Sequence, residues 1–399
     1  MSKPLSDIVE YNPKVTIKRG DLVNYIPMEE IVPNQRYVES TQQRVFSGGS
    51  KFENNDIIFA RITPCLQNRK IAQYKSQAQN PAAGSTEYFV FRSIPNVSDS
   101  SFVYYLLKSD FVVEPAIKSM KGASGRQRAE IQPILDLHLQ IPSYDTQIKI
   151  GKILSAYDEQ IENNNRRISI LEEMAQKVYR EWFVHFRFPG HENCKMVESE
   201  FGTIPQGWEY LDLFECSDIQ YGFAFKSKLF CNDSSLHPVV RIRDILGNKT
   251  ETFSPEMPNQ KYLLNEGDIL IGMDGIFHMN QWSGGAAYLN QRVVRIRPRC
   301  MSTFQLYYYL EPIIKDLETV ITGTTVAHLS DVDLKKIKVL VADKDTQIKA
   351  DSMMHSLLNQ KLNLLNKNTI LQKTRDLLLP TLINGDIDVS QFDIKIKEE

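Results

Sequence analysis

The sequence predicts an α+β fold, with two mixed α/β domains separated by two long helices that form an antiparallel coiled coil within the chain. The segment Asp-Thr-Gln-Ile-Lys occurs at 145–149 and again at 345–349, an offset of 200 residues. The stretch before each copy is rich in short β-forming runs, and the stretch after each copy carries apolar residues at helical spacing. Solenoid repeats are about 20–50 residues long, so this offset indicates a duplicated domain.

Each globular half combines short β-forming runs with glycine-rich turns and one short amphipathic helix. In the first half we expect strands at 56–61 and 87–92, a turn at 47–50 and a helix at 102–107. The corresponding segments of the second half are strands 238–242, 268–271 and 292–296, the turn 283–286 and the helix 304–310. The expected globular domains are therefore 1–144 and 191–344, and the expected helical segments are 145–190 and 345–399.

The first long helix has a heptad seam, because its positions alternate steps of three and four residues. The seam holds Tyr157, Ile161, Asn164, Ile168, Leu171, Ala175 and Val178. In the second helix the apolar seam positions are Leu357, Leu364, Leu371 and Leu378, and the polar residues Lys361, Asn368 and Arg375 interrupt them. Pro189-Gly190 is expected to end the first helix, and Pro380 with Gly385 the second.

A long helix with one apolar seam is not expected to stay isolated in water, because its seam would be exposed. A helix of roughly 35–40 residues is about 55 Å long at 1.5 Å per residue. We expect the two seams to pack against each other as an antiparallel pair within the chain, and self-association through the seams is the alternative. Asn164 lies in the seam, where a polar residue commonly fixes the register at a cost in stability.

The composition is that of a globular protein and excludes several classes. Of the 399 residues 42% are apolar and 24% are charged, and the net charge of −2 argues against a uniformly basic nucleic-acid protein while leaving room for local basic patches. Five cysteines without a CxxC pair argue against a disulfide framework and a structural zinc site. We expect no membrane span and a cytoplasmic location, because the chain lacks an apolar run of about 18 residues and a secretory signal.

The near-neutral total hides segments without acidic residues, which are candidate DNA-binding surfaces. Basic side chains and backbone N–H groups bind phosphate, and Arg and Gln can recognise base edges. The candidates in the first half are Arg61, Arg69 and Lys70, followed by Lys121, Ser124, Arg126, Gln127 and Arg128 around a Gly-Ala-Ser-Gly turn. A further acid-free segment lies between Asp274 and Glu311 and contains Arg292, Arg295, Arg297 and Arg299. The alternation of Arg295 and Arg297 also fits one face of an exposed strand. The alternative interpretation is an ordinary solvated basic surface.

Three further stretches of the second half fit a DNA-binding role. We expect a loop that contains Tyr221, Phe223 and Lys226, although aromatic residues are more often part of a core. Arg241 and Arg243 are expected on one face of a strand. The polar turn at Gly323 contributes Thr324, Thr325 and His328 as candidate DNA contacts.

Motifs for catalysis are absent from the sequence. Thr-Pro-Cys-Leu-Gln at 63–67 is similar to the Pro-Cys nucleophile of cytosine methyltransferases, but no glycine-rich strand–turn–helix for a methyl donor accompanies it. Ser-Gly-Gly-Ser-Lys at 47–51 is not a P-loop, which requires GxxxxGK[ST]. The seven histidines show no metal-ligand spacing. We therefore expect a protein that is not an enzyme, with no catalytic residues and no bound metal.

Taken together, these segments resemble the specificity (S) subunit of type I restriction–modification systems. The stretch 161–184 resembles the central helix of that family, and Phe-Gly-Thr-Ile-Pro-Gln-Gly-Trp at 201–208 resembles the entry to its second target-recognition domain. The segments 222–228, 267–270 and 323–329 and the junction at 142–147 are also similar to recurrent elements of these domains. The first domain departs from the pattern, since it has no early Gly-x-x-Phe-Lys near residue 20.

The resemblance implies a function. Each of two target-recognition domains would recognise one half of a split, asymmetric double-stranded DNA target, and the paired helices would set the spacing. Two modification (methyltransferase) subunits would dock on the chain, and two restriction (translocase and nuclease) subunits would join through them. This chain would hold no cofactor, since S-adenosylmethionine, ATP and magnesium would belong to the partners. A coiled-coil scaffold without DNA recognition is the alternative function.

Overall fold

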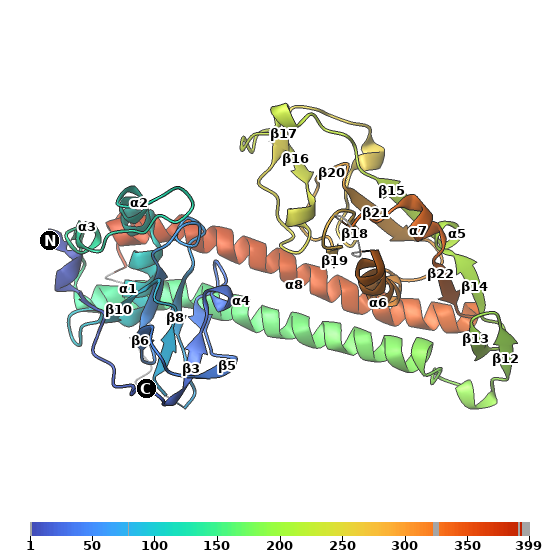
Figure 1. Ribbon diagram of the computed structural model, residues 1–399, viewed down its shortest axis with the longest axis horizontal. Coiled ribbons are helices and arrows are strands. Elements are labelled where there is room, and N and C mark those ends of the chain that lie inside the picture. Colours follow the sequence, from blue (N-terminus) through green and yellow to red (C-terminus); the bar gives the residue numbers. More distant parts are fainter. Residues whose placement is uncertain (1, 79, 322–326, 390–391, 393–399) are drawn as a thin grey trace. The chain divides into compact units, whose positions relative to one another are not determined.

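The computed structural model describes residues 2–78, 80–321, 327–389 and 392, and its chain forms two compact units. The first unit comprises Met1–Glu162 with Thr369–Glu399, and the second comprises Asn163–Asn368. Each unit contains one globular α/β part with a portion of both long helices (Figure 1). This confirms the predicted α+β fold with two long helices.

The first unit is built on a five-stranded sheet of order β2-β10-β7-β8-β4 and a four-stranded sheet of order β5-β3-β9-β6. Its strands are β1 (Ser2–Pro4), β2 (Val9–Tyr11), β3 (Leu22–Ile26), β4 (Tyr37–Val38), β5 (Gln42–Val45), β6 (Ser50–Phe52), β7 (Ile57–Ala60), β8 (Ile71–Tyr74), β9 (Ala82–Gly84), β10 (Tyr88–Ser93) and β11 (His138–Gln140). Its short helices are α1 (Ser100–Lys108), α2 (Asp110–Lys118) and α3 (Gln132–Leu135). Strands β1 and β11 form a separate antiparallel pair.

Helix α1 lies at the centre of the core of the first unit. Asp99 caps the helix by accepting a hydrogen bond from the backbone N–H of Phe102 at 2.8 Å. The residues from Phe102 to Leu107 are fully buried and pack with Phe59 and Phe89 of the sheet. The predicted amphipathic helix at 102–107 is therefore present, and it is buried on all sides.

The second unit repeats this arrangement with a four-stranded sheet of order β15-β21-β18-β19 and a three-stranded sheet of order β17-β16-β20. Its strands are β12 (Met196–Ser199), β13 (Gly202–Pro205), β14 (Glu209–Asp212), β15 (Ser217–Tyr221), β16 (His237–Val240), β17 (Phe253–Ser254), β18 (Ile269–Gly272), β19 (Met279–Gln281), β20 (Tyr288–Leu289), β21 (Val293–Pro298) and β22 (Lys338–Val341). Its short helices are α5 (Leu213–Cys216), α6 (Thr303–Ile321) and α7 (Asp331–Lys335). Helix α6 extends well beyond the predicted 304–310.

The strand registers show which positions of the two units correspond. Tyr88 of β10 pairs with Ala60 of β7, and Val293 of β21 pairs with Gly272 of β18. The parallel pairing of β3 with β9 recurs as the parallel pairing of β16 with β20. Strands β2, β10, β7 and β8 thus correspond to β15, β21, β18 and β19, and the duplication seen in the sequence is a duplication of topology.

The long helices are α4 (Tyr144–Tyr179), which continues as a π-helical turn at Arg180–Val184, and α8 (Lys344–Asn384). The prediction that Pro380 ends the second helix is wrong, because Pro380 lies within α8. A proline inside a helix costs about 3 kcal/mol, and burial of Leu379, Leu382 and Ile383 in the core of the first unit offsets that cost. Gly385, with φ of 78°, follows the last helical residue.

Within the second unit the helices pair in antiparallel directions. Lys361 forms an ion pair with Glu172 at 2.7 Å, and Asn368 accepts a hydrogen bond from Asn164 at 2.8 Å, so the numbering rises on one helix as it falls on the other. Asn368 also donates to Asn165 at 2.8 Å. Asn164 is thus buried in the seam, as predicted, and forms a hydrogen bond there with a polar residue of the other helix.

Polar residues that were expected to interrupt the second seam are themselves buried seam residues. Lys361, Asn368 and Arg375 are 7%, 6% and 1% exposed. Within the first unit Arg375 forms an ion pair with Asp158 of α4, so Asp158 takes the seam position that the sequence assigned to Tyr157. The predicted pairing residues Ile161, Ile168, Leu357 and Leu364 are buried, and Leu171, Val178, Leu371 and Leu378 are half-buried.

Candidate nucleic-acid interface

In each unit three backbone segments meet at one place beside the central sheet. In the first unit Arg61 donates its N–H to the carbonyl of Glu87 at 3.0 Å, and the N–H of Ala129 donates to the carbonyl of Arg61 at 2.8 Å. In the second unit the backbone N–H of Met273 donates to the carbonyl of Arg292 at 2.9 Å, and the N–H of Leu329 donates to the carbonyl of Met273 at 2.8 Å. The pattern of backbone hydrogen bonds is the same in both units, so three corresponding segments meet in each unit. We name the two places junction 1 and junction 2.

The correspondence at the junctions extends to single positions. Ile62 forms a β-bridge with Arg128, and Asp274 forms a β-bridge with His328. Glu87 directly precedes β10, and Arg292 directly precedes β21. Ile62, Glu87 and Arg128 of junction 1 therefore correspond to Asp274, Arg292 and His328 of junction 2.

Junction 1 is organised around the carboxylate of Glu87. Arg128 donates from Nε at 2.9 and 3.0 Å and from Nη2 at 2.6 Å, and Arg61 donates from Nε at 3.3 Å. The hydrogen bonds from Arg128 hold the pKa of Glu87 below its ordinary value, against the opposing effect of partial burial. The carboxylate is 19% exposed, whereas Arg128 is 47% exposed. The guanidinium group of Arg128 thus stands at the surface on a fixed, ionised support.

Junction 2 is organised around the carboxylate of Asp274. Nδ1 of His328 lies 2.7 Å from one carboxylate oxygen, and Nε of Arg292 lies 3.3 Å from the other. Arg292 lines a surface hollow of about 450 Å³ together with Arg241, Ile242, Arg243, Asp274, Ile276, His278 and Asn290. This hollow brings together three arginines and an amide, which are donors suited to phosphate and base acceptors.

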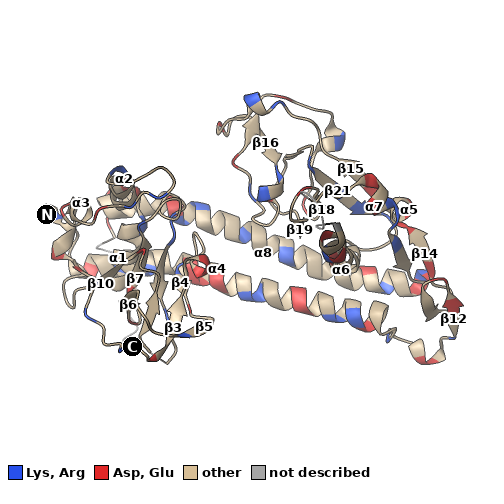
Figure 2. Ribbon diagram, viewed as in Figure 1, with Lys and Arg blue, Asp and Glu red and all other residues tan. Residues whose placement is uncertain are grey.

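The side chains at corresponding positions of the two junctions differ in charge. Glu87 of junction 1 corresponds to the cation Arg292, and the apolar Ile62 corresponds to the anion Asp274. The 3-10 turn at Met28–Glu30 after β3 corresponds to the turn at Ile242–Asp244 after β16, so the anion Glu29 stands where the second unit has the cation Arg243. Figure 2 shows how Lys, Arg, Asp and Glu are distributed over the elements that carry these segments. The two units therefore present side chains of different charge at corresponding backbone positions.

The structure separates the candidate residues of the first unit into two groups. Arg128, with Arg61, belongs to junction 1, and the exposed turn before it carries Ser124 and Arg126 with the half-buried Gln127. Lys121 in that turn forms an ion pair with Glu130 at 2.8 Å. Arg69 is bonded to Asp110 and to the carbonyl of Lys108. Lys70 lies next to junction 1, because its carbonyl accepts from the N–H of Ala60 at 3.1 Å, and its side chain donates to the carbonyl of Met28 at 2.8 Å.

In the second unit the expected strand face for Arg241 and Arg243 is wrong. Strand β16 ends at Val240, Arg241 precedes the 3-10 turn Ile242–Asp244, and Arg243 lies within it. The turn forms because Asp244 accepts a hydrogen bond from the backbone N–H of Arg241 at 2.9 Å, which ends the extended backbone. Both arginines nevertheless line the hollow at junction 2.

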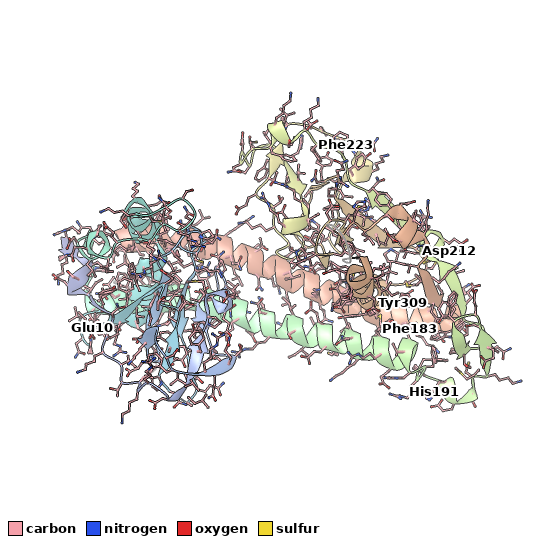
Figure 3. The ribbon with its side chains drawn as sticks, in the orientation of Figure 1. Glu10, Phe183, His191, Asp212, Phe223 and Tyr309 are labelled. Atoms are coloured by element: carbon pink, nitrogen blue, oxygen red, sulfur yellow. The ribbon has the colours of Figure 1, made fainter. Side chains whose placement is uncertain are left out.

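The aromatic segment of the second unit is mainly structural. Tyr221 is the last residue of β15 and donates to Asp331 at 2.7 Å, and Phe223 contacts the rings of Phe225 and Tyr262 (Phe223 is labelled in Figure 3). Lys226 is exposed. Of the candidates in the Gly323 turn, Thr324 and Thr325 lie outside the described residues, and His328 lies at junction 2.

Sequence reasoning missed Glu87 and Asp274 as site residues and did not single out Arg292. A search for acid-free segments passes over acidic residues at their borders, and Glu87 and Asp274 are such borders. Strand pairing brings Glu87 into contact with Arg128 and Asp274 into contact with Arg292, although these residues are far apart in the sequence. Across residues 2–78, 80–321, 327–389 and 392, no group of three or more His, Cys, Asp or Glu residues is placed to hold a metal ion. Within the same ranges no helix has the length and apolar character needed to cross a membrane.

Comparisons with known proteins agree with the duplicated architecture. The chain is 24% identical over 359 residues to the type I restriction enzyme MjaIX specificity subunit of Methanocaldococcus jannaschii, covering 84% of this chain and 80% of the relative. It is 22% identical to the HindI specificity subunit of Haemophilus influenzae, covering 96% of both chains. Its fold is similar to that of the type I restriction–modification S subunit of M. genitalium, with a TM-score of 0.52 and 19% identity over 98% of this chain and 96% of that chain.

The family model for the type I restriction modification DNA specificity domain matches the chain twice, at residues 1–173 and 205–373. Each match contains one of the two junctions and a large part of one long helix. The chain therefore belongs to the family of type I restriction–modification DNA specificity proteins.

Proposed function

We propose that this chain is the sequence-specificity subunit of a type I restriction–modification enzyme, and that each globular part recognises one half of a split, asymmetric double-stranded DNA target. The observation that carries the proposal is the pair of junctions, which have the same backbone connections and different side-chain charges. Two globular parts with the same fold can bind two DNA segments in the same orientation. Different side chains at corresponding positions then select different bases, so the two half-sites differ in sequence.

In this proposal the target-recognition domains are 1–144 and 191–344, and the helical segments 145–190 and 345–399 set the distance between the half-sites. Helix α4 has 36 residues and is therefore about 54 Å long. One turn of DNA is about 34–36 Å long. A helix of this length suits half-sites that are separated by base pairs the protein does not recognise.

The proposed division of labour leaves the chemistry to partner subunits. Two modification subunits would dock on this chain, and two restriction subunits would join through them. S-adenosylmethionine, ATP and magnesium would be bound by these partners, and this chain would supply no catalytic group. The complex would act in the cytoplasm, where it meets DNA.

The proposal is tested by co-expressing the full chain with the modification subunit encoded beside it and mapping methylated bases across the host genome. We expect methylation at one split motif with two unlike half-sites. Methylation that follows no motif, from a complex with an active modification subunit, would contradict the proposal. A chain that forms no complex and binds no DNA would favour the alternative, a coiled-coil scaffold without DNA recognition.

A further inference from the structure

We propose that each unit recognises a guanine of its half-site with an arginine that a carboxylate holds in place: Arg128 held by Glu87 in the first unit, and Arg292 held by Asp274 in the second. The inference rests on the proposed function, since it names the specificity-determining residues of a DNA-recognition subunit. It is carried by the two junctions, whose backbone hydrogen bonds and β-bridges correspond position by position.

In junction 1 the carboxylate binds one edge of the guanidinium group and leaves the other edge open. Glu87 accepts from Nε and Nη2 of Arg128, and among the described residues nothing bonds Nη1. The Nη1 and Nη2 groups together form a fork of donors that matches O6 and N7 of guanine in the major groove. Arg61 holds Glu87 from a second direction, so the support does not depend on a single contact.

In junction 2 the same relationship is made with different residues. Asp274 lies 3.3 Å from Nε of Arg292 and also binds His328 at 2.7 Å, so the histidine plays the part that Arg61 plays in junction 1. Arg292 is 52% exposed and borders the hollow that Arg241, Arg243 and Asn290 also line. The hollow provides space beside the guanidinium group for a base edge, and the other arginines can bind the flanking phosphates.

Holding an arginine before DNA arrives has a physical purpose. A free arginine side chain loses much conformational freedom when it forms two hydrogen bonds to a base, and a carboxylate that already fixes it removes part of that loss. Exposed ion pairs contribute little to folding stability, so stability alone does not account for the same arrangement at both junctions.

The proposed guanine-binding arginine comes from a different backbone segment in each of the two units. In the first unit it comes from the segment after the Gly-Ala-Ser-Gly turn, and in the second it comes from the segment that precedes β21. Two domains that approach DNA alike would then place their guanidinium groups over different base pairs. This predicts guanine at different offsets within the two half-sites.

The test uses the full chain co-purified with its modification subunit and a DNA library in which both half-sites are randomised. Bound DNA is selected and sequenced for the parent, R128K and R292K. Lysine keeps the charge and loses the fork. We expect each variant to lose roughly 5- to 150-fold of the preference for one guanine, in one half-site only, as expected for a bidentate contact. The other half-site serves as an internal control for folding.

Arg187 provides the matched control variant R187K. It donates to Glu181 from Nε at 2.6 Å and from Nη2 at 2.7 Å, so it repeats the Arg–Glu geometry away from both junctions. R187K should leave both half-sites unchanged. If R128K and R292K also leave every base preference unchanged, or weaken all sequences equally with a smaller salt dependence, the inference is overturned. A parent complex that selects no motif would instead refute the proposed function on which the inference rests.

Discussion

The buried ion pair between Asp158 and Arg375 is expected to hold the two long helices together in the first unit. The side chain of Arg375 is 1% exposed and that of Asp158 is 6% exposed. Burial acts to lower the pKa of Arg375, but the charges of Asp158 and Asp376 raise it above its ordinary value. Replacing Asp158 by leucine would therefore leave a charged arginine in the interior.

The expected loss for D158L follows from its contacts. Removing one partner of a buried ion pair costs about 3–5 kcal/mol. The hydroxyl of Tyr105 donates to Asp158 at 2.5 Å and would lose its acceptor, which adds about 1–3 kcal/mol. Asp376, at 2.8 Å from Arg375, remains as a partly exposed partner and reduces the penalty. We expect a total loss of about 4 kcal/mol in the free energy of unfolding, towards the lower end of the combined range.

The double variant D158L/R375M should regain most of this loss, because an apolar pair can replace a buried ion pair at little cost. Adding Y105F should remove the remaining penalty of the unpaired hydroxyl. A chain with two compact units need not unfold in one step, so the measurement is hydrogen exchange in the α4 and α8 segments of the first unit during denaturant titration.

Two outcomes would refute the reasoning about the ion pair. In one, D158L costs less than about 1 kcal/mol, which is the range of an exposed pair. In the other, D158L/R375M is as unstable as the sum of its single variants, which would show that the two side chains are not coupled. The exposed pair of Lys121 with Glu130, which also lies in the first unit, supplies the control, and E130Q should change stability by less than about 1 kcal/mol.

Three further predictions concern the seam, pH and the hollow. N164L should destabilise the second unit by about 1–3 kcal/mol because Asn368 loses its donor, and N164L/N368L should recover stability in denaturant titrations. Burial lowers the pKa of Lys108 to about 8, so the unfolded chain binds more protons than the folded chain between about pH 8 and 10 and stability should rise with pH there. K108M should abolish that rise relative to the parent and stabilise the protein by about 3 kcal/mol at pH 7, measured by denaturant titration at several pH values. R243Q should weaken binding to all DNA sequences alike and lower the slope of log affinity against log salt by about 1, and a change in base preference would contradict this phosphate role.

Local patterns predicted the elements well because local physics decides them. The alternation of three and four residues predicted the seam from Ile161 to Val178, and the repeat at 145 and 345 predicted that one fold occurs twice. Prediction failed where a distant contact outweighed the local preference. Pro380 stays helical because its neighbours are buried. Asp158, and not Tyr157, occupies the buried position of the seam, because its carboxylate forms an ion pair with Arg375.

The candidate DNA residues show the same division. Arg61 and Arg128 lie beside Glu87 at junction 1, and His328 lies beside Asp274 at junction 2, but neither acid was predicted. Lys70 and Arg69 were equally plausible in sequence, yet the charged group of Lys70 is bound to the carbonyl of Met28, and that of Arg69 to Asp110 and the carbonyl of Lys108. A search for runs of basic residues finds where charge is concentrated along the chain, and pairing across strands decides which charges remain available.

The sequence by itself determined the duplication, the two long helices and the resemblance to specificity subunits, because repeats and helical periodicity are properties of neighbouring residues. Only the tertiary structure decided which residues meet at the two junctions. Glu87 and Arg128 are 41 residues apart, and Asp274 and His328 are 54 residues apart. Their contacts depend on strand register and on the return of the chain after a helix, and neither leaves a periodic pattern in the sequence.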